Sequence, residues 1–212
     1  MRVVILANGE LGTSESARKC LVGTDMVICA DGGTRHALAL GLTPDVVIGD
    51  LDSMDDRARQ YIESCGARVI AHPRSKDETD LELALLHAVD QGAAEILVLG
   101  AQGGRIDHEL GNLLLLAHPR LVGIDVRMCC GDQEVLLIRD QAVLEGRVGD
   151  LLSLLPIGGD AHGVSSSGLE YALEDETLWL GPARGVSNVF VSPTVCVRVR
   201  DGVLWAVHTR LF

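Results

Sequence analysis

The sequence predicts a two-part fold: an α/β N-terminal domain with a mainly parallel sheet, followed by an all-β, sandwich-like C-terminal domain. Two observations carry this prediction. Up to about residue 130, short apolar runs alternate with stretches of helical periodicity, which is typical of βαβ units. Beyond it, short β-like runs follow one another with glycine-rich turns between them and no long helical pattern. We therefore expect domains at 1–130 and 131–212.

The N-terminal elements follow from apolar runs and the residues that stop them. The expected strands are 3–7, 26–30, 46–48, 68–70, 96–99 and 124–130, and the expected helices are 34–42, 55–65, 79–91 and 106–117. Pro44, Gly66 and Gly92 end the first three helices, because proline disfavours a helix before it and glycine accepts the conformation that closes one.

The C-terminal half reads as strands and turns only. The expected strands are 135–138, 142–144, 151–155, 169–173, 177–180, 195–199 and 203–207. The pair Asp201-Gly202 lies between the last two runs and predicts a hairpin that joins them.

Composition excludes several classes of protein. The chain has 212 residues and a formal net charge of −12, whereas a surface that binds nucleic acid needs excess Lys and Arg, so we expect no nucleic-acid partner. The six cysteines form no CxxC pair, which favours a reduced, cytoplasmic protein over a disulfide scaffold. No apolar run approaches the roughly 18 to 20 residues that span a membrane.

Aspartates follow several of the predicted strands. They are Asp31, Asp50, Asp52, Asp80 and Asp107. The loops after the strands of an open α/β sheet form its ligand crevice, and carboxylates gathered there repel one another unless a cation lies among them. Mg²⁺ takes oxygen ligands and is usually shared with substrate phosphates. The pattern therefore indicates metal-assisted phosphoryl-type chemistry.

Each of these motifs also has a structural interpretation. Asp50 and Asp52 are two apart, so an extended segment points both side chains to one side, where they would share a cation; alternatively, Asp52 or Ser53 caps the next helix. Thr79 with Glu82 predicts a capping box, while Asp80 in the same first turn suits either a cap or a metal.

The segment GAQGGRIDH at 100–108 is a glycine-bearing loop between a strand and a helix. Such a loop can present backbone N–H groups to phosphate, and Arg105 adds a cationic fork that suits phosphate oxygens. The segment is neither a P-loop nor a dinucleotide fingerprint. For His108, a structural role as a packed or capping residue and a functional role in this loop are equally consistent with the sequence.

In their order and spacing, these motifs resemble the thiamin pyrophosphokinase family. The resemblance rests on ADGG at 30–33, PDVVIGDLDS at 44–53, KDETD at 76–80, GGRIDH at 103–108 with Asn112, SSSGLEYAL at 165–173 and GVSN at 185–188. It covers nearly the whole chain. Two departures concern Val189, where an acidic residue is frequent, and Thr34-Arg35, where Ala or Asn is common.

The resemblance implies transfer of a pyrophosphoryl group from ATP to the hydroxyl of thiamin, with Mg²⁺, in a homodimer whose active sites lie at the subunit interface. It implies catalytic roles for Asp50, Asp52, Asp80, Arg105 and Asp107, the first three also as metal ligands. It implies nucleotide-side roles for Asp31, Gly32, Gly33, Lys76, Thr79 and Asn112, and thiamin-side roles for Tyr171, Ser187 and Asn188.

Three alternatives stay open at the level of sequence. Tyr171 is either a wall of the thiamin pocket or a core residue of the sandwich, since its predicted strand places it on one face with Leu169 and Leu173. The chain could also be a transferase acting on another small alcohol, or a non-catalytic thiamin- or nucleotide-binding protein. A cluster of aspartates at strand ends argues against a pure binder.

Overall fold

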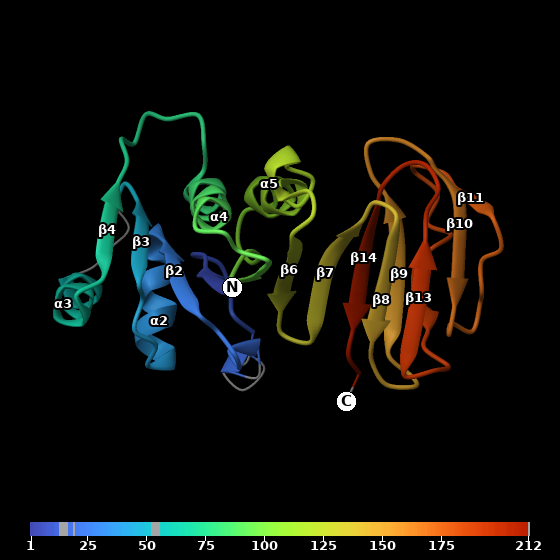
Figure 1. The fold of residues 1–212 in the computed structure, drawn as a ribbon, viewed down its shortest axis with the longest axis horizontal. Coiled ribbons are helices and arrows are strands. Elements are labelled where there is room, and N and C mark those ends of the chain that lie inside the picture. Colours follow the sequence, from blue (N-terminus) through green and yellow to red (C-terminus); the bar gives the residue numbers. More distant parts are fainter. Residues whose placement is uncertain (13–16, 19, 52–55, 212) are drawn as a thin grey trace. The chain divides into compact units, whose positions relative to one another are not determined.

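The computed structural model describes residues 1–12, 17–18, 20–51 and 56–211. They form two compact units, Met1–Gly131 and Asp132–Phe212. Figure 1 shows helices and strands in the first unit and strands alone over most of the second. The predicted fold class is confirmed.

The first unit is built on a parallel sheet. Its strands are β1 (Arg2–Leu6), β2 (Met26–Ala30), β3 (Val46–Gly49), β4 (Arg68–Ala71), β5 (Glu95–Leu99) and β6 (Asp125–Cys130). They lie in the order β6-β5-β1-β2-β3-β4, each parallel to its neighbours. The order reverses at β1, which has β2 on one side and β5 on the other. In open α/β sheets such a switch point is where ligands bind.

Helices connect these strands. They are α2 (Thr34–Leu40), α3 (Asp56–Cys65), α4 (Asp80–Asp90) and α5 (Ile106–Leu115), with short 3₁₀ turns η1 (Asp31–Gly33) and η2 (Pro119–Leu121). α2 ends earlier than expected, because Gly41 adopts a left-handed conformation (φ 68°) and its N–H closes the last turn on Leu38. The other helices agree with the expected ranges to within two residues.

The core of this unit forms because β-strands point alternate side chains to opposite faces. Val4, Leu6 and Val47 pack on one face of the sheet against Ala37 of α2 and Ile62 of α3. The central strands β1, β2, β3 and β5 are buried on both faces, which explains their near-continuous apolar sequences, whereas β4 at the edge of the sheet is largely exposed.

The second unit is a sandwich of two antiparallel sheets. Its strands are β7 (Gln133–Ile138), β8 (Gln141–Glu145), β9 (Leu151–Pro156), β10 (Ala161–Ser167), β11 (Glu176–Leu178), β12 (Asn188–Val189), β13 (Thr194–Arg198) and β14 (Leu204–Thr209). One sheet runs β12-β9-β14-β7 and the other β11-β10-β13-β8. Side chains from both sheets form a single buried cluster centred on Phe190, Leu152 and Val164.

The expected hairpin at Asp201-Gly202 is wrong. β13 pairs with β8 and β10, whereas β14 pairs with β7 and β9, so the two flanking strands belong to different sheets. Gly202 has φ 91°, and a Cβ there would lie 2.6 Å from the carbonyl oxygen of Asp160. The glycine therefore serves a tight crossing between layers rather than a two-residue hairpin turn.

The strand expected at residues 169–173 is also wrong. Leu169 makes only an isolated bridge to Phe190, and the residues that follow are bends and coil. The strand Ala161–Ser167 was missed, because its second half is a run of serines without the alternation that marks a half-buried strand.

Within the described part of the chain, no helix is long and apolar enough to cross a membrane.

Candidate functional site

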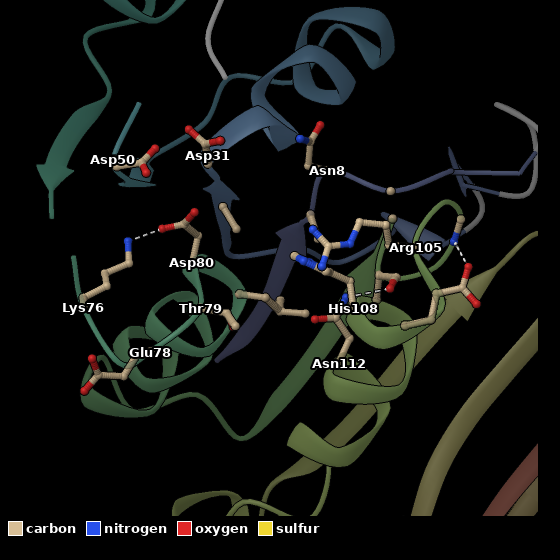
Figure 2. Close-up of a pocket in the computed structure, with 18 of the residues that line it drawn as sticks. Asn8, Asp31, Asp50, Lys76, Glu78, Thr79, Asp80, Arg105, His108 and Asn112 are labelled. Atoms are coloured by element: carbon tan, nitrogen blue, oxygen red, sulfur yellow. Dashed lines mark hydrogen bonds and ion pairs between the residues drawn. The ribbon is translucent and has the colours of Figure 1, made fainter. Parts of the chain in front are cut away.

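A pocket of about 470 Å³ opens at the carboxyl ends of the parallel strands, in the range usual for small-molecule sites. Figure 2 shows its charged and polar side chains converging from the loops after β1, β2, β3 and β5 and from the start of α4. Its polar and charged lining consists of Asn8, Asp31, Asp50, Arg74, Lys76, Glu78, Thr79, Asp80, Arg105, His108, Glu109 and Asn112.

Asp31 is the most constrained residue of this pocket. It follows β2 directly, has φ 41° and is only 6% exposed. A left-handed conformation is unfavourable for a residue with a Cβ, and such strain concentrates at functional sites. Gly49 makes the arrangement possible, because a Cβ there would lie 2.8 Å from the Cβ of Asp31. The buried Oδ1 of Asp31 has no hydrogen-bond partner among the described residues.

Three carboxylates meet at this point. Asp31, Asp50 and Asp80 each offer an oxygen, and these atoms lie within 4.8 Å of one another. Lys76, in the loop before α4, forms an ion pair with Asp80 in the first turn of that helix, as Figure 2 shows. Buried polar atoms are normally paired, so the unpaired Oδ1 of Asp31 beside two more carboxylates fits a divalent cation with oxygen ligands.

The other predicted metal residue, Asp52, lies outside the described residues, as does Ser53. The structure therefore places Asp50 and Asp80 together and adds Asp31 to them.

The start of α4 has the expected cap. The hydroxyl oxygen of Thr79 accepts a hydrogen bond from the backbone N–H of Glu82, 3.1 Å away. Asp80 occupies the first turn, where a negative charge is favourable. The cap therefore fixes the helix end that presents Asp80 to the pocket.

Arg105 and Asp107 form a pair at the start of α5. The Arg105 guanidinium donates to both carboxylate oxygens of Asp107, with the Nε–Oδ1 contact at 3.1 Å. This hydrogen bonding holds the pKa of Asp107 below and that of Arg105 above its ordinary value. Both side chains are exposed. Arg105 lines the pocket, whereas Asp107 is not among the lining residues and pairs with the Arg105 guanidinium.

Other predicted residues lie in or beneath the pocket wall. The Asn112 amide donates to the carbonyl oxygen of Ala101 at 2.7 Å and so fixes the loop after β5. Gly32 and Gly33 lie underneath: their missing Cβ atoms leave room for the Asn8 side chain and for the carbonyl oxygen of Leu6. Sequence reasoning missed Asn8 as a site residue, although its place directly after the first strand was the available signal.

The predicted thiamin-side residues come together in the second unit. The Asn188 amide spans the backbone of Tyr171: it accepts from the Tyr171 N–H at 3.0 Å and donates to the Tyr171 carbonyl at 2.7 Å. The Tyr171 side chain is 66% exposed, so it is not part of the sandwich core. Ser187 has φ 60°, and its N–H donates to the hydroxyl of Ser153 at 3.0 Å.

Comparison with known proteins relates both units to the same protein family. A family model described as "Thiamin pyrophosphokinase, catalytic domain" matches residues 17–128, and one described as "Thiamin pyrophosphokinase, vitamin B1 binding domain" matches residues 140–204. The thiamine pyrophosphokinase of Bacillus subtilis (strain 168) is 28% identical over 184 residues, covering 86% of each chain. Thiamine pyrophosphokinase 1 of Oryza sativa subsp. japonica is 26% identical over 209 residues, covering 86% of this chain and 78% of the relative.

Among solved structures, the crystal structure of thiamine pyrophosphokinase from Bacillus subtilis matches all of both chains with a TM-score of 0.88 and 26% identity. The catalytic-domain model alone spans more than half of the sequence. The chain belongs to the thiamin pyrophosphokinase family.

Proposed function

We propose that the pocket at the switch point of the parallel sheet is the site where this chain carries out the reaction of its family. That reaction is ATP-dependent pyrophosphorylation of thiamin, giving thiamin diphosphate and AMP. The observation that supports this location is the meeting of Asp31, Asp50 and Asp80. The buried Oδ1 of Asp31 has no hydrogen-bond partner in the part of the chain that the structure describes. A buried carboxylate oxygen is costly unless it is paired or coordinates a metal, so the cluster supports a cation at this place.

We propose Asp31, Asp50 and Asp80 as the ligands of a divalent cation, with Mg²⁺ as the natural choice for oxygen ligands next to phosphates. Asp52 keeps the role that its motif implies, as a further ligand. When bound, the cation neutralises charge on the triphosphate.

The remaining residues position the reactants. Lys76 and Arg105, both on the pocket wall, balance phosphate charge, and Asp107 keeps the Arg105 fork in one orientation. The thiamin hydroxyl attacks the β-phosphorus in line, the bond to the α-phosphate oxygen breaks, and AMP leaves. A carboxylate of the cluster accepts the hydroxyl proton. Reactions of this type depend mainly on positioning and electrostatics.

We propose that thiamin is recognised by the second unit, at Tyr171, Ser187 and Asn188. The exposed aromatic face of Tyr171 suits a cationic thiazolium ring. In this unit Ser187 carries backbone strain of the kind found at ligand sites.

We propose a homodimer. α5 carries Ile106, Leu110 and Leu114 at four-residue spacing, each at least half exposed, and it has no buried residue. An apolar helical stripe of this kind is expected to be covered by another surface, and an interface beside Arg105 would place a second copy at the active site. Leu110→Glu should produce monomers by light scattering, whereas an unchanged dimer mass would contradict this interface.

The six free cysteines support a reducing compartment, so we also propose a cytoplasmic location.

Product identification tests the proposed function. The protein is incubated with ATP, Mg²⁺ and thiamin, and the nucleotides and thiamin esters are separated by chromatography. We expect AMP and thiamin diphosphate in equal amounts. Stoichiometric ADP, or thiamin monophosphate as the product, would contradict pyrophosphoryl transfer.

A further inference from the structure

The segment Asn8-Gly9, which follows β1 after Ala7, is held in place by two consecutive side chains of α2. The Arg35 guanidinium donates to the carbonyl oxygens of Asn8 and Gly9, at 2.5 and 2.9 Å. The Nε2 of His36 lies 2.8 Å from the same Gly9 oxygen. Because a carbonyl oxygen can only accept, Nε2 is the donor in this contact. Burial holds the pKa of His36 below its ordinary value, which keeps the ring neutral near neutral pH.

The backbone on the other side of this segment is equally fixed. The N–H of Gly9 donates to the Gly100 carbonyl at 2.7 Å, and the N–H of Glu10 donates to Gln102 at 2.6 Å. A Cβ on Gly9 would lie 2.1 Å from the Gln102 carbonyl oxygen. The backbone of this segment is therefore held between α2 and the loop after β5, and the close approach at Gly9 leaves no space for a side chain there.

Both residues of this segment line the pocket, and Asn8 contributes its side chain there. Asn8 lines the pocket and is exposed, and Figure 2 shows it between Asp31 and Arg105. Among the described residues, its amide makes no hydrogen bond. The Asn8 side chain packs directly on Gly32: a Cβ added to Gly32 would lie only 2.4 Å from the Asn8 amide group.

We propose that Asn8 is a further nucleotide-binding residue, donating from its amide to the triphosphate of ATP, and that Arg35 is a positioning residue that acts through Asn8. This inference rests on the proposed function for the identity of the nucleotide. Arg35 does not line the pocket, and its guanidinium is engaged by the two carbonyls, so it reaches the phosphates only through the segment that it holds.

The chemistry of Arg35 suits this role. A planar guanidinium can donate to two adjacent carbonyl oxygens at once, as Arg35 does to those of Asn8 and Gly9.

The test is a double-mutant cycle on nucleotide binding. Binding of α,β-methylene-ATP with Mg²⁺ is measured by calorimetry, without thiamin, for the wild type, Asn8→Ala, Arg35→Ala and the double variant. Asn8→Ala should raise the Kd about tenfold, the usual value of a hydrogen bond to a charged group. Arg35→Ala should raise it about threefold. In the Asn8→Ala background Arg35→Ala should have no further effect, because coupled residues are non-additive.

Arg59→Ala is the matched control, since Arg59 is an exposed cation of α3 that does not line the pocket. It should leave the Kd unchanged, and Arg35→Lys, which restores one donor, should recover part of the loss. All variants should keep the wild-type Tm. Additive effects of Asn8→Ala and Arg35→Ala would show that Arg35 acts on the nucleotide directly, and a wild-type Kd for Asn8→Ala would remove Asn8 from the site; either result overturns the inference.

Turnover of thiamin is scored separately on the same samples. A protein that shows this coupling in nucleotide binding but no pyrophosphoryl transfer would retain the Asn8–Arg35 inference and lose the proposed function.

Discussion

Among the described residues, each unit of the molecule buries one aspartate almost completely, and the two are held in opposite ways. Asp150 in the second unit is 3% exposed, and its carboxylate accepts from the N–H of Arg147, the N–H of Leu211 and the His208 ring, at 2.9 to 3.1 Å. Asp31 in the first unit is 6% exposed, yet its Oδ1 has no hydrogen-bond partner among the described residues.

This difference separates a structural carboxylate from a functional one. Both are buried aspartates, and each hydrogen bond to Asp150 offsets the free-energy cost of burying its charge. The buried Oδ1 of Asp31 has no such bond among the described residues, and the backbone of Asp31 is strained as well. Proteins keep such costs mainly where a ligand later removes them. Between these two buried aspartates, hydrogen-bond satisfaction rather than burial distinguishes the pocket residue from the structural one.

The largest expected effect concerns activity. Asp31→Asn, and likewise Asp50→Asn and Asp80→Asn, should each lower kcat at least about a hundredfold, because charge stabilisation at metal sites is worth several kcal/mol. Asp31→Asn should leave the Tm unchanged or raise it, since it relieves repulsion among the three carboxylates. Asp90→Asn is the control: its carboxylate pairs with Arg120 at the exposed end of α4, and the variant should keep full activity. Near wild-type turnover of Asp31→Asn at saturating Mg²⁺ would remove Asp31 from the site.

The opposite pattern is expected at Asp150. Asp150→Ala leaves the N–H groups of Arg147 and Leu211 without their acceptor and should lower the free energy of unfolding by about 3 kcal/mol, as when one member of a buried pair is removed. Its KM for ATP should stay at the wild-type value. Chemical denaturation measures the free energy of unfolding, and steady-state kinetics on the same sample measures the KM for ATP. A variant with unchanged stability would show that the three hydrogen bonds to Asp150 do not stabilise the fold.

The thiamin-side residues should give an intermediate effect. Tyr171→Ala and Asn188→Ala should each raise the KM for thiamin about tenfold, with the ATP KM nearly unchanged; a lost aromatic face over a cation is worth about 1 to 2 kcal/mol. Because Tyr171 is exposed, its truncation should cost little thermal stability. Asn188 should act by holding the Tyr171 backbone, so the double variant should resemble Tyr171→Ala. Steady-state kinetics with each substrate varied in turn decides this. Equal shifts in both KM values would contradict the assignment of Tyr171 and Asn188 to the thiamin site.

The smallest expected effect is a pH dependence of stability. Burial alone would raise the pKa of Asp150, but the hydrogen bonds from Arg147, His208 and Leu211 outweigh it and hold the pKa below its ordinary value. Stability from a lowered pKa is fully present above the unfolded value of about 3.9 and is lost as the pH falls through the folded pKa. The wild type should therefore lose more stability than Asp150→Asn as the pH falls from about 5 through the folded pKa of Asp150. Parallel denaturation curves for the two proteins over this range would contradict the assignment.

The α/β unit was well predicted from sequence because its signals are local. Apolar runs buried on both faces, helical stripes such as that of 80–90, and stops such as Gly66 and Gly92 place each element without reference to distant residues. The ends of parallel strands meet at one edge, so the convergence of Asp31, Asp50 and Asp80 could also be expected from the order of elements.

The sandwich was predicted less well because its pairing is non-local. Asp201-Gly202 has the local chemistry of a hairpin, but the layer to which each flanking strand belongs is set by its partners β8 and β9, far away in sequence. The segment around Tyr171 alternates like a strand, but Asn188 captures the backbone groups of Tyr171 that a neighbouring strand would need. The unpaired oxygen of Asp31 and the clamp of Arg35 on Asn8 are likewise properties of packing, which no pattern of residue types reveals.

The most direct test of this contrast is calorimetric binding of α,β-methylene-ATP with Mg²⁺ to the wild type, Asp31→Asn and Asp150→Asn. If Asp31 is held without a hydrogen bond because it serves the metal–triphosphate complex, Asp31→Asn should weaken binding at least about tenfold, the value of a lost charge-assisted contact. Asp150→Asn should bind as the wild type does. Equal affinities for the wild type and Asp31→Asn would contradict the assignment of this pocket as the nucleotide site.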